Sequence, residues 1–143
     1  MLYSDFLAQD PSCPFCSPRL SADRIITKNH DAFLTVPLAP YRPDDLMIIP
    51  FQHVCELLKV PEHPLKSIYQ LVETAVDLIH KKGHTDYSLL TRFGPTTGSS
   101  IAHLHAFVLP GDSIDRAHLP SSGREVLSPE ELHARIQSFK ELL

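Results

Sequence analysis

Apolar and polar positions along the chain mark out five short extended segments. Short runs rich in β-branched and aromatic residues, bounded by turn-forming residues, are typical of strands. Such runs lie at 24–28, 32–36, 46–49, 87–93 and 101–109. The run at 46–49 is continuously apolar and is closed by Pro50, which indicates a central strand covered on both faces.

Two further segments have the periodicity of helices. One predicts a helix over 64–82 with a single apolar stripe, formed by Leu65, Ile68, Val72, Ala75 and Ile79. The sequence Ser128-Pro129-Glu130-Glu131 is typical of a capping box and predicts a helix through Leu143. Residues 1–20 are expected to be irregular and residues 111–127 to form a polar loop. Five strands, with the long helix before the last two, predict a single α+β domain over 1–143 with a mostly antiparallel sheet.

Composition narrows the possible functions. The net charge is −4 and no run of lysine or arginine occurs, which argues against a surface that coats nucleic acid. No apolar run is long enough to span a bilayer, and the N-terminal residues lack the basic-then-apolar form of a signal peptide. We therefore expect a cytoplasmic protein with no membrane partner, and no specific nucleic acid is indicated.

The segment Gly94–Pro110 carries the most promising chemistry. It begins as a loop rich in glycine and hydroxyl groups and then enters the last predicted strand. Side chains alternate along a strand, so His103, His105 and Phe107 are expected to share one face. Gly98, Ser99 and Ser100 could cradle a phosphate with N–H and O–H donors, because glycine permits close backbone approach to an anion.

A neutral imidazole such as that of His105 can attack an activated phosphate and form a nucleotidyl-imidazole. The loop N–H groups and the Ser100 hydroxyl could then stabilise charge on the phosphoryl oxygens. The alternative is a tight connection followed by an ordinary strand, with the histidines satisfied by common hydrogen bonds.

Cys13 and Cys16 form a Cys-x-x-Cys pair, which by itself fits a zinc half-site, a redox pair or chance. The redox reading needs a preceding strand and a helix start, and neither is predicted here. His53, at the end of a strand, and His103 could complete a closed tetrahedral Cys₂His₂ site, which would make the zinc structural. Cys55 lies outside this set and is expected to be an ordinary thiol.

Three motifs in this order resemble the histidine-triad (HIT) family. They are Cys13-Pro14-Phe15-Cys16, Met47-Ile48-Ile49-Pro50-Phe51-Gln52-His53 and Gly98-Ser99-Ser100-Ile101-Ala102-His103-Leu104-His105-Ala106-Phe107-Val108. The resemblance implies an HIT-like sheet and a nucleotide hydrolase or nucleotidyltransferase acting on the α-phosphate, with His105 as the nucleophile. It also implies zinc on Cys13, Cys16, His53 and His103, and a possible homodimer.

Phe107 stands where the family places its third histidine or a glutamine, and phenylalanine cannot hydrogen-bond a leaving-group oxygen. This departure keeps a second reading open, a zinc-stabilised nucleotide-binding module with little or no turnover. A third reading is a structural fold without a ligand. In the first two, the phosphate would contact Gly98, Ser99 and Ser100 beside His103 and His105. The base and sugar would lie on the segment 32–36, at Phe33.

Overall fold

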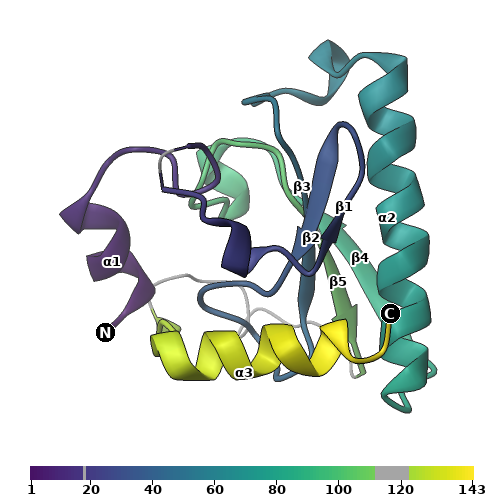
Figure 1. Cartoon of the computed structure of the whole chain (residues 1–143). Coiled ribbons are helices and arrows are strands. Elements are labelled where there is room, and N and C mark those ends of the chain that lie inside the picture. The colour runs from purple at the N-terminus through teal and green to yellow at the C-terminus, as the bar shows by residue number, and fades with distance from the viewer. Residues whose placement is uncertain (18, 112–122) are drawn as a thin grey trace.

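The structure is a computed structural model that describes residues 1–17, 19–111 and 123–143. Its centre is a five-stranded antiparallel sheet with the strand order β1-β2-β3-β5-β4 (Figure 1). The strands are β1 (Thr27–Lys28), β2 (Ala32–Thr35), β3 (Leu46–Pro50), β4 (Tyr87–Thr91) and β5 (Ala106–Pro110). The helices are α1 (Tyr3–Gln9), α2 (Glu62–Lys81) and α3 (Pro129–Lys140), with short 3₁₀ turns η1 (Ala22–Arg24), η2 (Leu57–Lys59) and η3 (Pro95–Thr97). The predicted α+β fold is confirmed.

β3 lies in the middle of the sheet and every one of its residues is buried. Leu46 and Ile48 belong to the apolar cluster that the sheet forms with α2, while Met47 and Ile49 belong to the cluster on the opposite face. This arrangement explains the continuous apolar run, because a strand covered on both faces has no polar side.

α2 packs along one face of the sheet (Figure 1). Its buried residues Ile68, Leu71, Ala75, Leu78 and Ile79 face Val108 and the residues of β2 and β3 in the same cluster. At the other end of the chain, the Ser128 side chain accepts from the Glu131 N–H and the Glu131 side chain accepts from the Ser128 N–H. The capping box is therefore confirmed at the start of α3.

The expectation that residues 1–20 are irregular needs correction. Residues 3–9 form α1. A segment of only seven residues is too short for hydrophobic periodicity to indicate a helix. The expected loop at 111–127 includes residues 112–122, which lie outside the described residues. Of the remainder, Glu125 pairs with Leu2 in an isolated antiparallel bridge and the Val126 N–H donates to the Met1 carbonyl, so this segment is joined to the N-terminal residues.

The last strand begins later than predicted, at Ala106. Before that residue the chain leaves the sheet, and the Leu104 N–H donates to the Val54 carbonyl at 2.6 Å instead of to a strand partner. His103 and His105 therefore precede β5. Their common orientation is nevertheless retained, because the Phe15 ring contacts both imidazoles edge-on at 5.8 and 5.4 Å between centroids.

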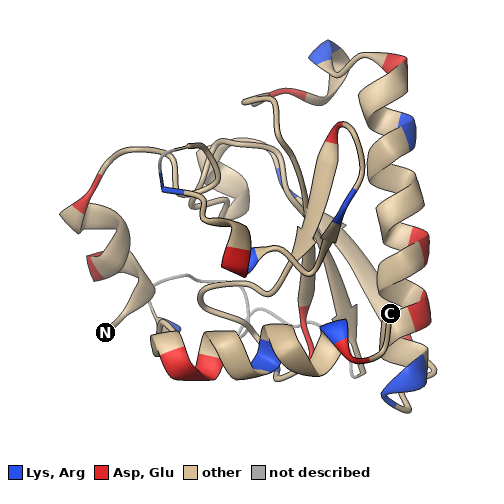
Figure 2. Ribbon diagram, in the orientation of Figure 1, with Lys and Arg blue, Asp and Glu red and all other residues tan. Residues whose placement is uncertain are grey.

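Charged residues of both signs are interspersed along α2 and α3 (Figure 2). None of the helices formed by the described residues has the length and apolar character needed to cross a membrane.

Candidate functional site

The structure brings Cys13, Cys16, His53 and His103 together at the end of β3. Their ligand atoms all lie within 4.8 Å of one another. The His103 Nδ1 atom is 3.5 Å from Cys13 Sγ, 3.4 Å from Cys16 Sγ and 3.1 Å from His53 Nδ1. The His53 Nδ1 atom is 3.3 Å from Cys16 Sγ. The four side chains come from three separate segments of the chain.

These separations match the edges of a zinc tetrahedron. With Zn–S near 2.3 Å and Zn–N near 2.05 Å, tetrahedral S···N and N···N edges are about 3.5 and 3.3 Å. The Nε2 atom of the fully buried His103 lies 2.7 Å from the Pro50 carbonyl oxygen. Since a carbonyl only accepts, Nε2 carries the proton and Nδ1 keeps its lone pair for a metal. The donor set and its spacing therefore fit Zn²⁺.

Burial, with the neighbouring Cys13 thiol adding to it, raises the pKa of the Cys16 thiol to about 11. A thiolate at this position is thus disfavoured by the protein alone, and a bound cation is the usual means of reversing that preference. Cys55, which lies outside the ligand set, is exposed, and its Sγ lies 3.4 Å from His53 Nε2. It therefore contacts the nitrogen of His53 that faces away from the cluster.

His105 is buried and its orientation is fixed. Its Nδ1 atom lies 2.7 Å from the His103 carbonyl oxygen, so Nδ1 is the protonated nitrogen and Nε2 carries the lone pair. Burial lowers the pKa of His105, and the positive charges of Arg92 and Arg124 lower it further. The imidazole is consequently neutral at pH 7, which is the state a nucleophile requires.

A small cavity beside His105 is lined by two arginines that sequence reasoning missed. Arg92, Arg124, Phe107 and Ser100 border it together with Tyr3 and Phe15. Its volume is about 10 Å³, room for roughly one water molecule. Arg92 follows β4 directly, but Arg124 stands alone in a segment without periodicity, so no sequence pattern joins the two.

Tyr41 holds both guanidinium groups. Arg92 donates to the Tyr41 hydroxyl, and the Arg124 guanidinium lies 4.0 Å from the centroid of the Tyr41 ring. Arg124 also donates to the Ala39 carbonyl, while its buried Nε has no hydrogen-bond partner among the described residues. Two cations and one unsatisfied donor next to a neutral imidazole make the cavity suitable for an anion.

The glycine-rich loop contributes unevenly. Gly94 and Gly98 flank η3 with φ values of 87° and 84°, a backbone region that favours glycine. The Ser99 hydroxyl donates to the Ile101 carbonyl and is used within the loop, whereas Ser100 lines the His105 cavity. Phe33 is fully buried and contacts Phe51, with centroids 5.1 Å apart, in the apolar cluster that contains Phe107.

Phe107 lies where the alternation of side chains predicted. Its ring centroid is 5.3 Å from that of His105 and 5.6 Å from that of Tyr41. The Phe107 ring therefore lies beside the His105 imidazole, at the position where the resemblance to the HIT family would place a third polar residue.

The fold and these motifs define the class of protein. The chain belongs to the HIT domain family, whose model matches residues 19–114. It is 26% identical over 105 residues to AP-4-A phosphorylase of Mycobacterium tuberculosis, an alignment covering 70% of this chain and 54% of that protein. The chain thus spans about half the length of the curated relatives it matches.

Two solved structures show the shared fold. One is Plasmodium falciparum diadenosine triphosphate hydrolase in complex with cyclomarin A, with a TM-score of 0.75, 13% identity, and coverage of 98% of this chain and 95% of that one. The other is a Zn-bound histidine triad family protein from Mycobacterium smegmatis, with a TM-score of 0.68, 18% identity, and coverage of 92% and 95%.

Proposed function

We propose that this protein binds a nucleotide and cleaves or transfers its α-phosphoryl group through His105. The observation that carries the proposal is the hydrogen bond between His105 Nδ1 and the His103 carbonyl oxygen, which leaves Nε2 unprotonated beside a cationic cavity. The Nε2 lone pair forms a bond to phosphorus, and the bond from phosphorus to the leaving oxygen breaks with its electron pair. Water or a second substrate then displaces the imidazole, which leaves neutral as the attacking oxygen loses its proton.

Arg92 and Arg124 would carry the electrostatic part of catalysis. Charge builds on the phosphoryl oxygens in the transition state, and fixed cationic donors in a buried site stabilise it strongly. The cavity as it stands is too small for a nucleotide. Binding therefore requires side chains that line the cavity to move and make room for the phosphate.

Phe107 restricts the leaving groups. The Phe107 ring lies against the His105 imidazole and cannot donate a proton, so a leaving oxygen on this side is expected to depart as a stable anion. Phosphate-chain leaving groups meet this requirement, since their conjugate acids are strong and their charge suits the two arginines. The names of AP-4-A phosphorylase and diadenosine triphosphate hydrolase support placing dinucleoside polyphosphates first among the substrates to test.

Zinc on Cys13, Cys16, His53 and His103 would act structurally. Four protein ligands leave no open position for water or substrate. The ion would tie the proline-rich segment around Cys13 to the end of β3 and would fix the peptide of His103, whose carbonyl orients His105.

A nucleotide-binding module with little turnover is the second candidate, and Phe107 together with the closed cavity favours it. The experiment that separates the two is incubation with dinucleoside polyphosphates, nucleoside phosphoramidates and nucleotide sugars, with product and protein mass followed together. Turnover of any member supports the enzyme, whereas binding without turnover supports the module.

We further propose a homodimer through β4. This strand lies at the edge of the sheet and exposes Tyr87 and Leu89, with Tyr69 of α2 exposed on the same flank. An unpaired edge with exposed apolar residues is a ready surface for strand pairing. Sedimentation should show a dimer that Leu89→Lys converts to a monomer.

A further inference from the structure

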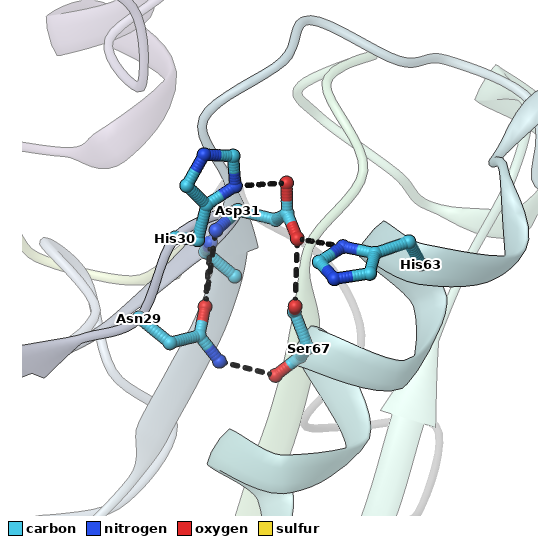
Figure 3. Close-up of polar contacts among 6 residues, drawn as sticks. Asn29, His30, Asp31, His63 and Ser67 are labelled. Atoms are coloured by element: carbon cyan, nitrogen blue, oxygen red, sulfur yellow. Dashed lines mark hydrogen bonds and ion pairs between the residues drawn. The ribbon is translucent and has the colours of Figure 1, made fainter.

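A second cluster of ligand-type side chains lies where the β1–β2 turn meets the start of α2 (Figure 3). The Asp31 carboxylate bridges two imidazoles. Its Oδ1 lies 3.0 Å from His30 Nδ1 and its Oδ2 lies 2.7 Å from His63 Nδ1. The ligand atoms of these three residues all lie within 4.8 Å of one another. None of them belongs to the Cys₂His₂ cluster or to the His105 cavity.

Hydrogen bonds from Ser67 and Asn29 hold the Asp31 segment in place. The Ser67 hydroxyl donates to Asp31 Oδ2 at 2.7 Å, and Asn29 Nδ2 donates to the Ser67 carbonyl at 2.8 Å. The Asn29 side-chain oxygen in turn accepts from the N–H groups of Asp31 and Ala32. Figure 3 shows this ring of contacts joining the turn to the helix. Such support is what orients a metal-binding carboxylate.

The two imidazoles, by contrast, are open to solvent. The side chains of His30 and His63 are 88% and 75% exposed, whereas that of Asp31 is 16% exposed. Surface ion pairs of this kind contribute little to stability, because each costs side-chain entropy and is screened by water. A fixed carboxylate flanked by two accessible imidazoles is better explained by a ligand that enters from solvent.

We propose that His30, Asp31 and His63 form an exchangeable binding site for a divalent transition-metal ion, with Zn²⁺ as the ion we would test. Imidazole nitrogen and carboxylate oxygen are ligands that Zn²⁺ prefers, and three protein ligands leave a position for water. To bind the metal through Nδ1, each imidazole must carry its proton on Nε2, so that the Nδ1 lone pair is directed at the metal and not at a hydrogen bond to Asp31.

The geometry needs an adjustment. Tetrahedral N···O edges around Zn²⁺ are about 3.4 Å, compared with 3.0 Å from His30 Nδ1 to Asp31 Oδ1 and 2.7 Å from His63 Nδ1 to Asp31 Oδ2, so the rings must move apart from the carboxylate by about 0.4 and 0.7 Å. Exposed side chains accommodate such shifts readily. The ion would link the β1–β2 turn to α2 and would bind more weakly than at a closed Cys₂His₂ site.

The test is calorimetric titration of the purified protein with Zn²⁺ in a weakly coordinating buffer, with folding checked by circular dichroism. Wild type should take up one additional, exchangeable equivalent, and the imidazole ¹⁵N resonances of His30 and His63 should shift. His63→Ala and Asp31→Asn should abolish this uptake, while Ser67→Ala, which removes only the support, should weaken it by about 10-fold.

His80→Ala is the matched control, because His80 is an exposed histidine elsewhere on α2. It should leave the titration unchanged. The proposal is overturned if wild type takes up no additional equivalent, or if folded His63→Ala binds Zn²⁺ as wild type does. Equal weakening by His80→Ala would also overturn it, since the uptake would then be a general property of surface histidines.

Discussion

The ring of Phe107 packs edge-on against the imidazole of His105, with 5.3 Å between the ring centroids. This contact keeps water from one side of the His105 imidazole, and a phenylalanine there supplies no proton to a leaving group. The preference of the site for particular leaving groups can therefore be tested by kinetics.

Phe107→His should raise kcat/KM selectively for substrates with poor leaving groups, such as nucleoside phosphoramidates. A hydrogen-bonding group at this position contributes roughly 10²–10⁴-fold to rate, so an increase within that range is expected. Dinucleoside polyphosphates should change by much less, because their leaving groups depart unaided. Phe107→Leu is the control, since it keeps the site apolar. An equal increase for both substrate classes would contradict this role of Phe107.

Arg124→Gln and Arg92→Gln should each lower kcat for dinucleoside polyphosphates by about 10²–10³-fold, because each removes a cation beside the phosphoryl group. Steady-state kinetics on folded variants measure the effect. Arg135→Gln serves as a control, since Arg135 lies on α3 and donates to the Pro43 carbonyl away from the cavity. If the Arg124 and Arg92 variants match Arg135→Gln, the two cations have no part in catalysis.

The pH profile follows from the lowered pKa of His105. Only the neutral imidazole is nucleophilic, so activity is lost as pH falls through the pKa of His105 in the folded protein. Because burial and the two arginines move that pKa below the ordinary value of about 6.5, kcat/KM should stay on its plateau below pH 6.5. An acid limb centred above pH 6.5 would mean that His105 is not the titrating nucleophile.

Cys13→Ser should abolish zinc binding at the four-residue cluster and destabilise the protein. Metal-binding free energy at a structural site is folding free energy, and each kcal/mol lowers Tm by about 4 °C in a domain of this size. We expect a loss of at least about 10 °C, or no folding. Cys55→Ser, which changes an exposed thiol outside the cluster, should bind zinc and melt like wild type. An unchanged melting temperature for Cys13→Ser would exclude a structural zinc.

Sequence reasoning brought out the parts of the site that rest on short motifs. Cys13, Cys16, His53 and His103 meet in space because a strand end and a segment leading into the neighbouring strand are adjacent in the sheet, a relation that strand patterns reveal. The exact start of β5 could not be foreseen. The alternation of side chains extends back through His103 and His105. At these residues, however, the chain has not yet paired with β3, and the Leu104 N–H donates to the Val54 carbonyl instead.

The convergence of Arg92, Arg124 and Tyr41 could not be predicted from the sequence. They come from three segments far apart in the chain, and their convergence depends on how the segment 123–127 pairs with the N-terminal residues. The cluster of His30, Asp31 and His63 was missed for the same reason, since His63 approaches the turn only through the packing of α2 on the sheet.

The stereochemistry of turnover reports whether His105 forms a covalent bond to the α-phosphorus. A dinucleoside polyphosphate with a chiral thio-substituted α-phosphate, cleaved in ¹⁸O-labelled water, reports how many displacements occur at phosphorus. Two in-line displacements, first by His105 Nε2 and then by water, predict overall retention of configuration. Overall inversion would show a single direct attack by water and would exclude a covalent intermediate on His105.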